Sequence, residues 1–253
     1  MNHGWRFFMS DKSKAAKVGS KGLFGRGKKD KTDEERFKGM PEKWKKCVIF
    51  DFDGTVADTY DVALQILHEI ADARRTDAPR DIESLRMMSA AEVIRKYRLS
   101  VLDLLFFEKK YEDGIYRCIC DIKPFAGLKA VLRKLDKSYG LGIISSNRRE
   151  NVFAFLHHTG LDRYFDFLET GSPLLGKPRR IRAIMKKHGY RRADVVYVGD
   201  EVRDVEAGRK VGVKVVAVGW GFNKTKRLKA AKPDFFVSRP SQLVSAAKKA
   251  LGR

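Results

Sequence analysis

The sequence predicts an α/β protein, namely a doubly wound parallel β-sheet with a small all-helical cap inserted after its first strand. Two observations carry this prediction. Short, continuously apolar runs recur after residue 44, each ending abruptly in polar residues, and amphipathic stretches of helical length separate them. Continuous apolarity is typical of strands covered on both faces, as in parallel sheets, and regular alternation of strands with helices favours a doubly wound architecture.

Four apolar runs are predicted to be strands of this sheet. They cover residues 47–50, 141–144, 195–198 and 213–218. The predicted core helices lie between them, at 128–136, 150–159, 179–188 and 202–211. In such sheets ligands bind beyond the carboxyl ends of the strands, and Asp51, Ser145 and Asp200 fall at those ends.

Residues 60–121 interrupt the alternation. A helix is predicted over 62–71, a capping box at Ser89-Ala-Ala-Glu92 opens a second helix, and Ser100-Val-Leu-Asp103 opens a third. A segment of about sixty residues is too long for a loop and suits a cap over the strand ends. We therefore predict a catalytic core of residues 44–59 and 122–253, with 60–121 as the cap. Its aromatic residues are expected to form the interior of the cap rather than a substrate wall: Phe106, Phe107, Tyr111 and Tyr116.

The chain is strongly basic, with 53 Lys and Arg against 32 Asp and Glu and a net charge of +21. Residues 1–43 lack a sustained apolar period, so we expect a mostly disordered arm. A positive field favours anionic partners, and residues 1–46 are a candidate for weak binding to nucleic acid or an anionic surface. The aromatic residues of the arm are sparse, which gives base stacking limited support.

The composition excludes several classes of protein. Hydrophobic residues make up 43% of the chain, enough for a sizeable core, which argues against wholesale disorder. No uncharged apolar run approaches the ~20 residues needed to cross a bilayer, and no secretory signal is recognisable. Three cysteines do not make a disulfide framework and suit a reducing compartment. We therefore expect a cytoplasmic protein without a transmembrane segment.

The first predicted strand runs into Asp51-Phe-Asp53-Gly54-Thr55. Carboxylates at positions i and i+2 point the same way if the chain remains extended. One can then attack a phosphorus atom while the other handles the proton of the leaving group. Gly54 lets the backbone turn sharply and approach a ligand closely. The alternative is a surface turn rich in Asp, and the further motifs that follow in order argue against it.

Two later segments offer groups for binding a phosphoryl oxygen. Ser145 ends the second predicted strand and is followed by Ser146 and Asn147, so a hydroxyl and exposed N–H groups are available there. Lys177, in Gly176-Lys-Pro178, would neutralise charge shared between the nucleophile and the phosphoryl group. Each segment is weak evidence by itself.

A second acidic motif is Gly199-Asp200-Glu-Val-Arg-Asp204. Asp200 lies at a strand end, and Asp204 follows one helical turn later. Together with Asp51 they form an oxygen-rich set suited to Mg²⁺, which keeps several waters and takes few protein carboxylates. Such an ion would offset repulsion between the carboxylates and an anionic substrate.

These motifs, in this order, resemble the haloacid dehalogenase superfamily of phosphohydrolases. The resemblance covers about residues 46–240. It includes Asp-x-Asp-Gly-Thr-Val at 51–56, Ser145, Lys177 and the Gly-Asp-x3-Asp motif at 199–204. The helical insertion and Ile122-Lys-Pro-Phe-Ala-Gly127 are similar to the branch with a C1-type cap, which includes phosphoglycolate phosphatase.

The resemblance implies a role for each motif residue. Asp51 would be the nucleophile that forms an aspartyl-phosphate, and Asp53 would protonate the leaving oxygen and then activate water. Ser145 and Lys177 would bind the phosphoryl group. The metal residues would be Asp51, Asp53 through its backbone carbonyl, and Asp200, with Asp204 outside this inner set. The remaining candidate substrate-binding residues are Gly54, Thr55, Ser146 and Asn147.

The predicted function is Mg²⁺-dependent hydrolysis of a small phosphorylated metabolite, such as a phosphoglycolate-like compound. Asp53 argues against carbon–halogen cleavage, because the resemblance implies that dehalogenases lack this second Asp and need no Mg²⁺. Three alternatives stay open. They are a phosphomutase, a nucleotidase or pyrophosphatase on the same fold, and a binding role through the basic arm.

Overall fold

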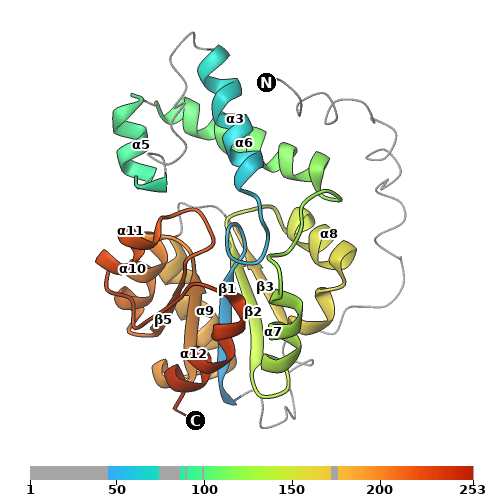
Figure 1. The fold of residues 1–253 in the computed structure, drawn as a ribbon, viewed down its shortest axis with the longest axis vertical. Helices are drawn as coiled ribbons and strands as arrows, with labels where there is room; N and C mark the ends of the chain where they lie inside the picture. The colour runs from blue at the N-terminus through green and yellow to red at the C-terminus, as the bar shows by residue number, and fades with distance from the viewer. Residues whose placement is uncertain (1–44, 74–85, 89, 99, 172–175, 253) are drawn as a thin grey trace. The chain divides into compact units, whose positions relative to one another are not determined.

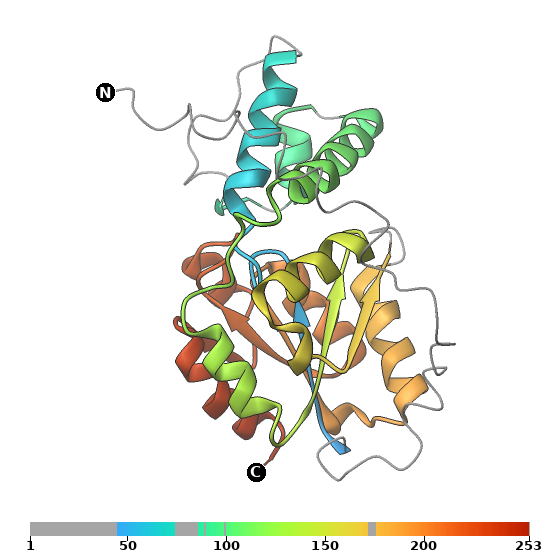
Figure 2. The same ribbon diagram turned by 90° about the vertical axis from the view of Figure 1, so that its right-hand side faces the viewer.

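Within the described residues, six parallel strands form one sheet in the order β3-β2-β1-β4-β5-β6 (Figures 1 and 2). The computed structural model describes residues 45–73, 86–88, 90–98, 100–171 and 176–252, which all belong to one structural unit, Pro41–Arg253. The strands are β1 (Cys47–Asp51), β2 (Gly140–Ser145), β3 (Phe167–Thr170), β4 (Val195–Gly199), β5 (Lys214–Val218) and β6 (Phe235–Val237). The predicted parallel α/β sheet is confirmed. The arm predicted over 1–43 lies outside the described residues.

The register of the central strands brings the predicted motifs to one edge of the sheet. Asp51 at the end of β1 pairs with Ile144, the residue before Ser145. Phe50 pairs with Val198 of β4, two residues before Asp200. β1 thus lies between β2 and β4, where the strand order reverses, which is the place where ligands bind in doubly wound sheets.

Helices cover both faces of the sheet. The core helices are α7 (Leu128–Leu135), α8 (Arg149–Thr159), α9 (Gly176–His188), α10 (Val202–Val211), α11 (Thr225–Ala230) and α12 (Leu243–Ala250), with short 3₁₀ turns at Asp162–Tyr164, Arg192–Asp194 and Pro240–Gln242. Val48 and Phe50 pack in one cluster with α7, α8 and α12, whereas Ile49 packs on the opposite face with α9 and α10. Alternate residues of β1 are therefore buried under different helices, which explains the unbroken apolar run.

Residues 60–121 contain α3 (Tyr60–Ala73), α5 (Ala90–Lys96) and α6 (Val101–Cys118), which lie beyond the carboxyl ends of the strands (Figures 1 and 2). α3 packs against α6, and Gly114 permits the close approach, because a Cβ there would lie 2.9 Å from Ile66 Cδ1. The boundaries of the core and cap stay a prediction. Ser89 of the predicted capping box lies outside the described residues. No described helix is long and apolar enough to cross a membrane.

The structure differs from the predicted elements in its end strands, at the start of α9 and in its last two helices. β3 and β6 were not predicted, because these end strands are short and only partly buried and so lack a long apolar run. Helix α9 begins at Gly176, three residues earlier than predicted, which places Lys177 in its first turn. Helices α7, α8 and α10 agree with the prediction to within a residue, whereas α11 and α12 were not predicted.

The packing of α8 against the first motif can be tested with one substitution. Phe155 is fully buried, and its ring meets that of Phe52 edge-on at 5.3 Å between centroids. Because Phe155→Ala would leave a cavity, we expect the free energy of unfolding in urea to fall by about 3–5 kcal/mol. Phe153→Ala on the same helix is the matched control, since Phe153 is 41% exposed, and it should change stability by less than about 0.5 kcal/mol. Equal losses would contradict this packing.

Candidate active site

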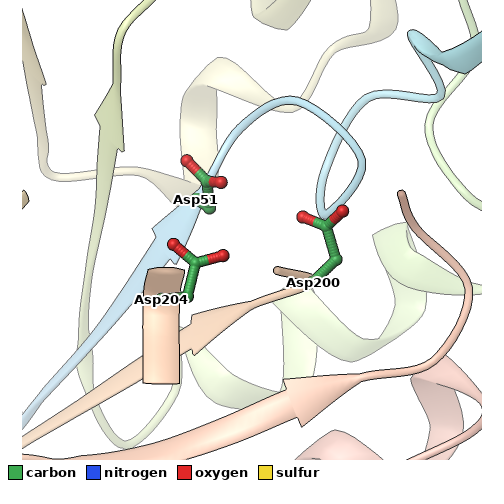
Figure 3. Close-up of side chains that lie close together, drawn as sticks. All are labelled: Asp51, Asp200 and Asp204. Atoms are coloured by element: carbon green, nitrogen blue, oxygen red, sulfur yellow. The ribbon is translucent and has the colours of Figure 1, made fainter. Parts of the chain in front are cut away.

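Three buried carboxylates meet at the carboxyl edge of the sheet (Figure 3). Asp51 ends β1, Asp200 follows β4, and Asp204 lies in the first turn of α10. One carboxylate oxygen from each residue lies within 4.8 Å of the other two, and the residues are 4%, 0% and 0% exposed, respectively. The structure therefore brings together the three acidic side chains that the sequence singled out.

A buried lysine compensates part of this negative charge. Lys177 Nζ donates a hydrogen bond to Asp51 Oδ2 at 2.6 Å and another to Asp204 Oδ1. The second oxygen of Asp204 accepts a bond from the Glu201 N–H at 3.0 Å, so the protein engages both oxygens of Asp204. Burial lowers the pKa of Lys177, but the carboxylates of Asp204 and Asp51 outweigh burial and raise it above its ordinary value. The ammonium group stays charged.

The cluster has an excess of negative charge that suits a divalent cation. Burial raises the pKa of Asp51 to about 7; Lys177 lowers this pKa and Asp204 raises it. Burial, together with the charges of Glu201 and Asp51, raises the pKa of Asp200 well above its ordinary value. Because burial disfavours their ionised forms, a further positive charge nearby would lower these pKa values and stabilise the ionised carboxylates. Hard oxygen donors in this arrangement fit Mg²⁺ by their chemistry.

Asp200 is fixed by contacts with the first motif and with the loop after β5. The Thr55 hydroxyl donates to Asp200 Oδ1 at 2.7 Å, and the Phe222 N–H donates to Oδ2 at 2.6 Å. Gly54 has a φ of +73°, which confirms the expected turn, and a Cβ there would lie 2.3 Å from Asp200 Oδ2. Thr55, expected to bind substrate, here uses its hydroxyl to hold Asp200.

Asp53 has a different environment from Asp51 and does not belong to the side-chain cluster of carboxylates found among the described residues. Its Oδ1 accepts a hydrogen bond from the Tyr111 hydroxyl at 2.8 Å and one from Asn147 Nδ2 at 3.4 Å. Burial raises the pKa of Asp53, and these neutral donors oppose the rise. Asp51 is therefore paired with a cation, whereas Asp53 is held by uncharged groups.

The segment after β2 contributes polar groups to the same edge. Ser145 is fully buried, and its Oγ accepts a bond from the Asn147 N–H at 2.9 Å, so the hydroxyl hydrogen can be donated elsewhere. Asn147 Oδ1 accepts bonds from the Arg148 N–H at 2.9 Å and from Asn151 Nδ2 at 3.0 Å. These bonds orient the Asn147 amide with Nδ2 toward Asp53. Ser146 is half-buried beside it.

The expectation for the aromatic residues of the insertion needs correction. Phe106 and Tyr116 are 48% and 45% exposed, so they are not interior residues. The Tyr111 side chain of α6 contacts Asp53, and the sequence did not predict this contact. The two residues lie 58 positions apart, and no spacing in the sequence connects them. The contact of the Phe222 N–H with Asp200 was also missed, because a hydrogen bond donated by the backbone does not depend on residue type.

The sequence matches the family of haloacid dehalogenase-like hydrolases over residues 48–218, and the chain belongs to this family. It is 37% identical over 203 residues to a phosphoglycolate phosphatase of Synechococcus elongatus, covering 79% of this chain and 96% of that protein. It is 26% identical over 223 residues to the pyrophosphatase PpaX of Bacillus velezensis, covering 81% of this chain and 97% of that protein. The predicted family is confirmed.

Solved structures share the fold at lower identity. A haloacid dehalogenase-like family protein from Streptococcus pneumoniae superposes with a TM-score of 0.68 at 20% identity, covering 79% of this chain and 97% of that one. A haloacid dehalogenase-like protein from Agrobacterium tumefaciens gives a TM-score of 0.64 at 22% identity, covering 81% and 98%. These likenesses establish the fold alone.

The pKa of Asp51 predicts how stability depends on pH without divalent cations. Because its folded-state pKa of about 7 lies above the unfolded value of about 3.9, the stability from this group is present below pH ~4 and is lost as the pH rises through about 7. Asp51→Asn cannot titrate. In EDTA, we expect the unfolding free energy of the wild type minus that of the variant to fall by more than about 1 kcal/mol from pH 5 to pH 8.

Urea denaturation at both pH values measures this difference. Asp121→Asn is the control, because Asp121 is an exposed carboxylate outside the site. Its difference from the wild type should stay constant with pH. A difference for Asp51→Asn that stays constant or rises with pH would contradict the effect of burial on Asp51.

Proposed function

We propose that this protein is a Mg²⁺-dependent phosphatase that hydrolyses a small phosphorylated metabolite of the phosphoglycolate type. The observation that carries the proposal is the pair Asp51 and Asp53, two residues apart, one held by Lys177 beside an acidic cluster and the other held by neutral donors. The similarity to a phosphoglycolate phosphatase over most of the chain supports the substrate class.

In the first step, the Asp51 carboxylate attacks phosphorus and forms an aspartyl-phosphate. The bond from phosphorus to the leaving oxygen breaks, and that oxygen takes a proton from Asp53. In the second step, Asp53 accepts a proton from a water molecule that attacks the same phosphorus atom. Inorganic phosphate leaves, and Asp51 is restored. Burial raises the pKa of Asp53, which supports its role as the group that carries the proton.

The neighbouring residues bind the anions of this reaction. Lys177 offers a buried positive charge to the phosphoryl group, and Ser145 offers its hydroxyl hydrogen. The backbone at Gly54-Thr55 and at Ser146-Asn147 borders the same edge of the sheet and completes the phosphoryl-binding set.

The acidic residues are the groups that would hold the metal. Asp51, the Asp53 carbonyl and Asp200 would hold Mg²⁺, while Lys177 and the Glu201 N–H keep Asp204 in place beside them. When bound, Mg²⁺ supplies positive charge that offsets the repulsion between the carboxylates and the phosphoryl group.

A pyrophosphatase is the second candidate, because a relative named pyrophosphatase PpaX matches 81% of the chain at 26% identity. The phosphomutase and nucleotidase alternatives have no comparable observation in their favour. Nucleic-acid binding through residues 1–46 finds no support in the named relatives. A cytoplasmic location stays a prediction.

Phosphate release across a panel of phosphorylated metabolites tests the proposal. The panel contains phosphoglycolate, sugar phosphates, nucleotides and pyrophosphate, each with and without Mg²⁺. We expect Mg²⁺-dependent release from phosphoglycolate, lowered at least about 10³-fold in Asp51→Asn because the nucleophile is lost. Asp121→Asn should match the wild type. A preference for pyrophosphate would favour the second candidate, and near-wild-type activity of Asp51→Asn would overturn the mechanism.

The metal assignment has a test that does not depend on turnover. Asp200→Asn removes one carboxylate charge from the cluster, so Mn²⁺ binding followed by electron paramagnetic resonance should weaken at least about tenfold. Glu206→Gln is the matched control, because Glu206 is exposed on the adjacent helix α10 and lies outside the cluster. Unchanged Mn²⁺ affinity in Asp200→Asn would remove Asp200 from the set of ligands.

A further inference from the structure

We propose that Tyr111 of α6 is a positioning residue that holds the Asp53 carboxyl group in the orientation needed to protonate the leaving oxygen. The inference rests on the proposed phosphatase function and extends it to a side chain outside the four sequence motifs. Tyr111 does not touch the reacting atoms in this proposal. It acts through Asp53 alone.

The contact between the two residues is direct. The Tyr111 hydroxyl donates to Asp53 Oδ1 at 2.8 Å, a normal length for a hydrogen bond between oxygen atoms. Asn147 Nδ2 approaches the same oxygen at the longer distance of 3.4 Å. Because both donors reach Oδ1, the proton of the neutral carboxyl group is left on Oδ2. Tyr111 is the shorter contact and therefore the main constraint on the rotation of this carboxyl group.

Tyr111 is suited to donate rather than to share the proton. The hydroxyl lies 2.8 Å from Asp53 Oδ1, and a phenol has an ordinary pKa of about 10, so Tyr111 keeps its proton at neutral pH. When the bond between phosphorus and the leaving oxygen breaks, the proton on Asp53 Oδ2 moves to that oxygen. Tyr111 keeps its own proton and stabilises the carboxylate that remains.

The segment after β2 holds α6 next to Tyr111. Arg148 forms ion pairs with Glu112 at 2.5 Å and with Asp113 at 3.1 Å, and Asn151 Nδ2 donates to the Glu112 carbonyl at 2.8 Å. The two residues that follow Tyr111 are thus bound to the core. These contacts with the core fix the part of α6 that carries the Tyr111 hydroxyl.

Packing within the inserted helices also restrains Tyr111. The Phe107 ring, one helical turn earlier, stacks on the Tyr111 ring with centroids 5.9 Å apart. Gly114, one turn later, brings α6 close to Ile66 of α3. A side chain fixed by its own helix and by the core can orient Asp53 at little entropic cost.

Leaving-group dependence distinguishes this role from a merely structural one. Phenyl phosphate and 4-nitrophenyl phosphate have similar size, but 4-nitrophenolate is a far better leaving group and needs little help from an acid. The ratio kcat/KM reports the steps through departure of the leaving group. We expect Tyr111→Phe to lower kcat/KM about tenfold for phenyl phosphate and phosphoglycolate, and less than about threefold for 4-nitrophenyl phosphate. Asp53→Asn should show the same pattern with larger losses.

Tyr116→Phe is the matched control, because Tyr116 lies on the same helix and is 45% exposed. It should leave all three kcat/KM values unchanged. Equal losses for Tyr111→Phe on phenyl and 4-nitrophenyl phosphate, or no loss on either, would overturn the positioning role while leaving the phosphatase function intact. A wild-type protein that hydrolyses none of these esters would instead overturn the proposed function itself, and this inference with it.

Discussion

The buried bridge from Lys177 to Asp51 and Asp204 is the interaction on which the site depends. Three carboxylates within 4.8 Å of one another repel each other, and burial of each costs free energy unless positive charge compensates. The sheet makes compensation feasible, because α9 and α10 pack on the same face and bring Lys177 and Asp204 together beside the end of β1. One lysine balances only part of the charge, and the remaining negative charge suits a divalent cation.

The second organising feature is the separation of two carboxylates that are neighbours in sequence. Asp51 faces Lys177, whereas Asp53 meets the Tyr111 hydroxyl and the Asn147 amide. Burial raises the pKa of both carboxyl groups, but Asp51 has the Lys177 cation within hydrogen-bond distance to favour its ionised form, whereas the donors to Asp53 are neutral. A nucleophile has to ionise and gains from such a cation, and an acid has to hold a proton, so the two environments support the proposed division of roles.

Much of the fold and the acidic cluster could be predicted because the responsible signals are local. Strands buried on both faces leave continuous apolar runs, and parallel strands bring their carboxyl ends to one edge, so Asp51 and Asp200 were expected to meet. β3 and β6 escaped prediction because end strands are covered less completely and need no such run. The early start of α9 was missed because Gly176 and Pro178 are residues typical of loops, although Pro is tolerated in a first helical turn.

The parallel α/β architecture, the family motifs and the carboxylates that gather could all be predicted, since residue type and spacing carry that information. The contacts of Thr55 with Asp200 and of Tyr111 with Asp53 depend instead on how distant segments pack together. The difference is one of scale. A hydrogen bond requires two groups to lie within about 3 Å of each other. The hydrophobic pattern of α6 specifies which face is buried, but how α6 packs on α3 and docks on Arg148 decides where its hydroxyl lies.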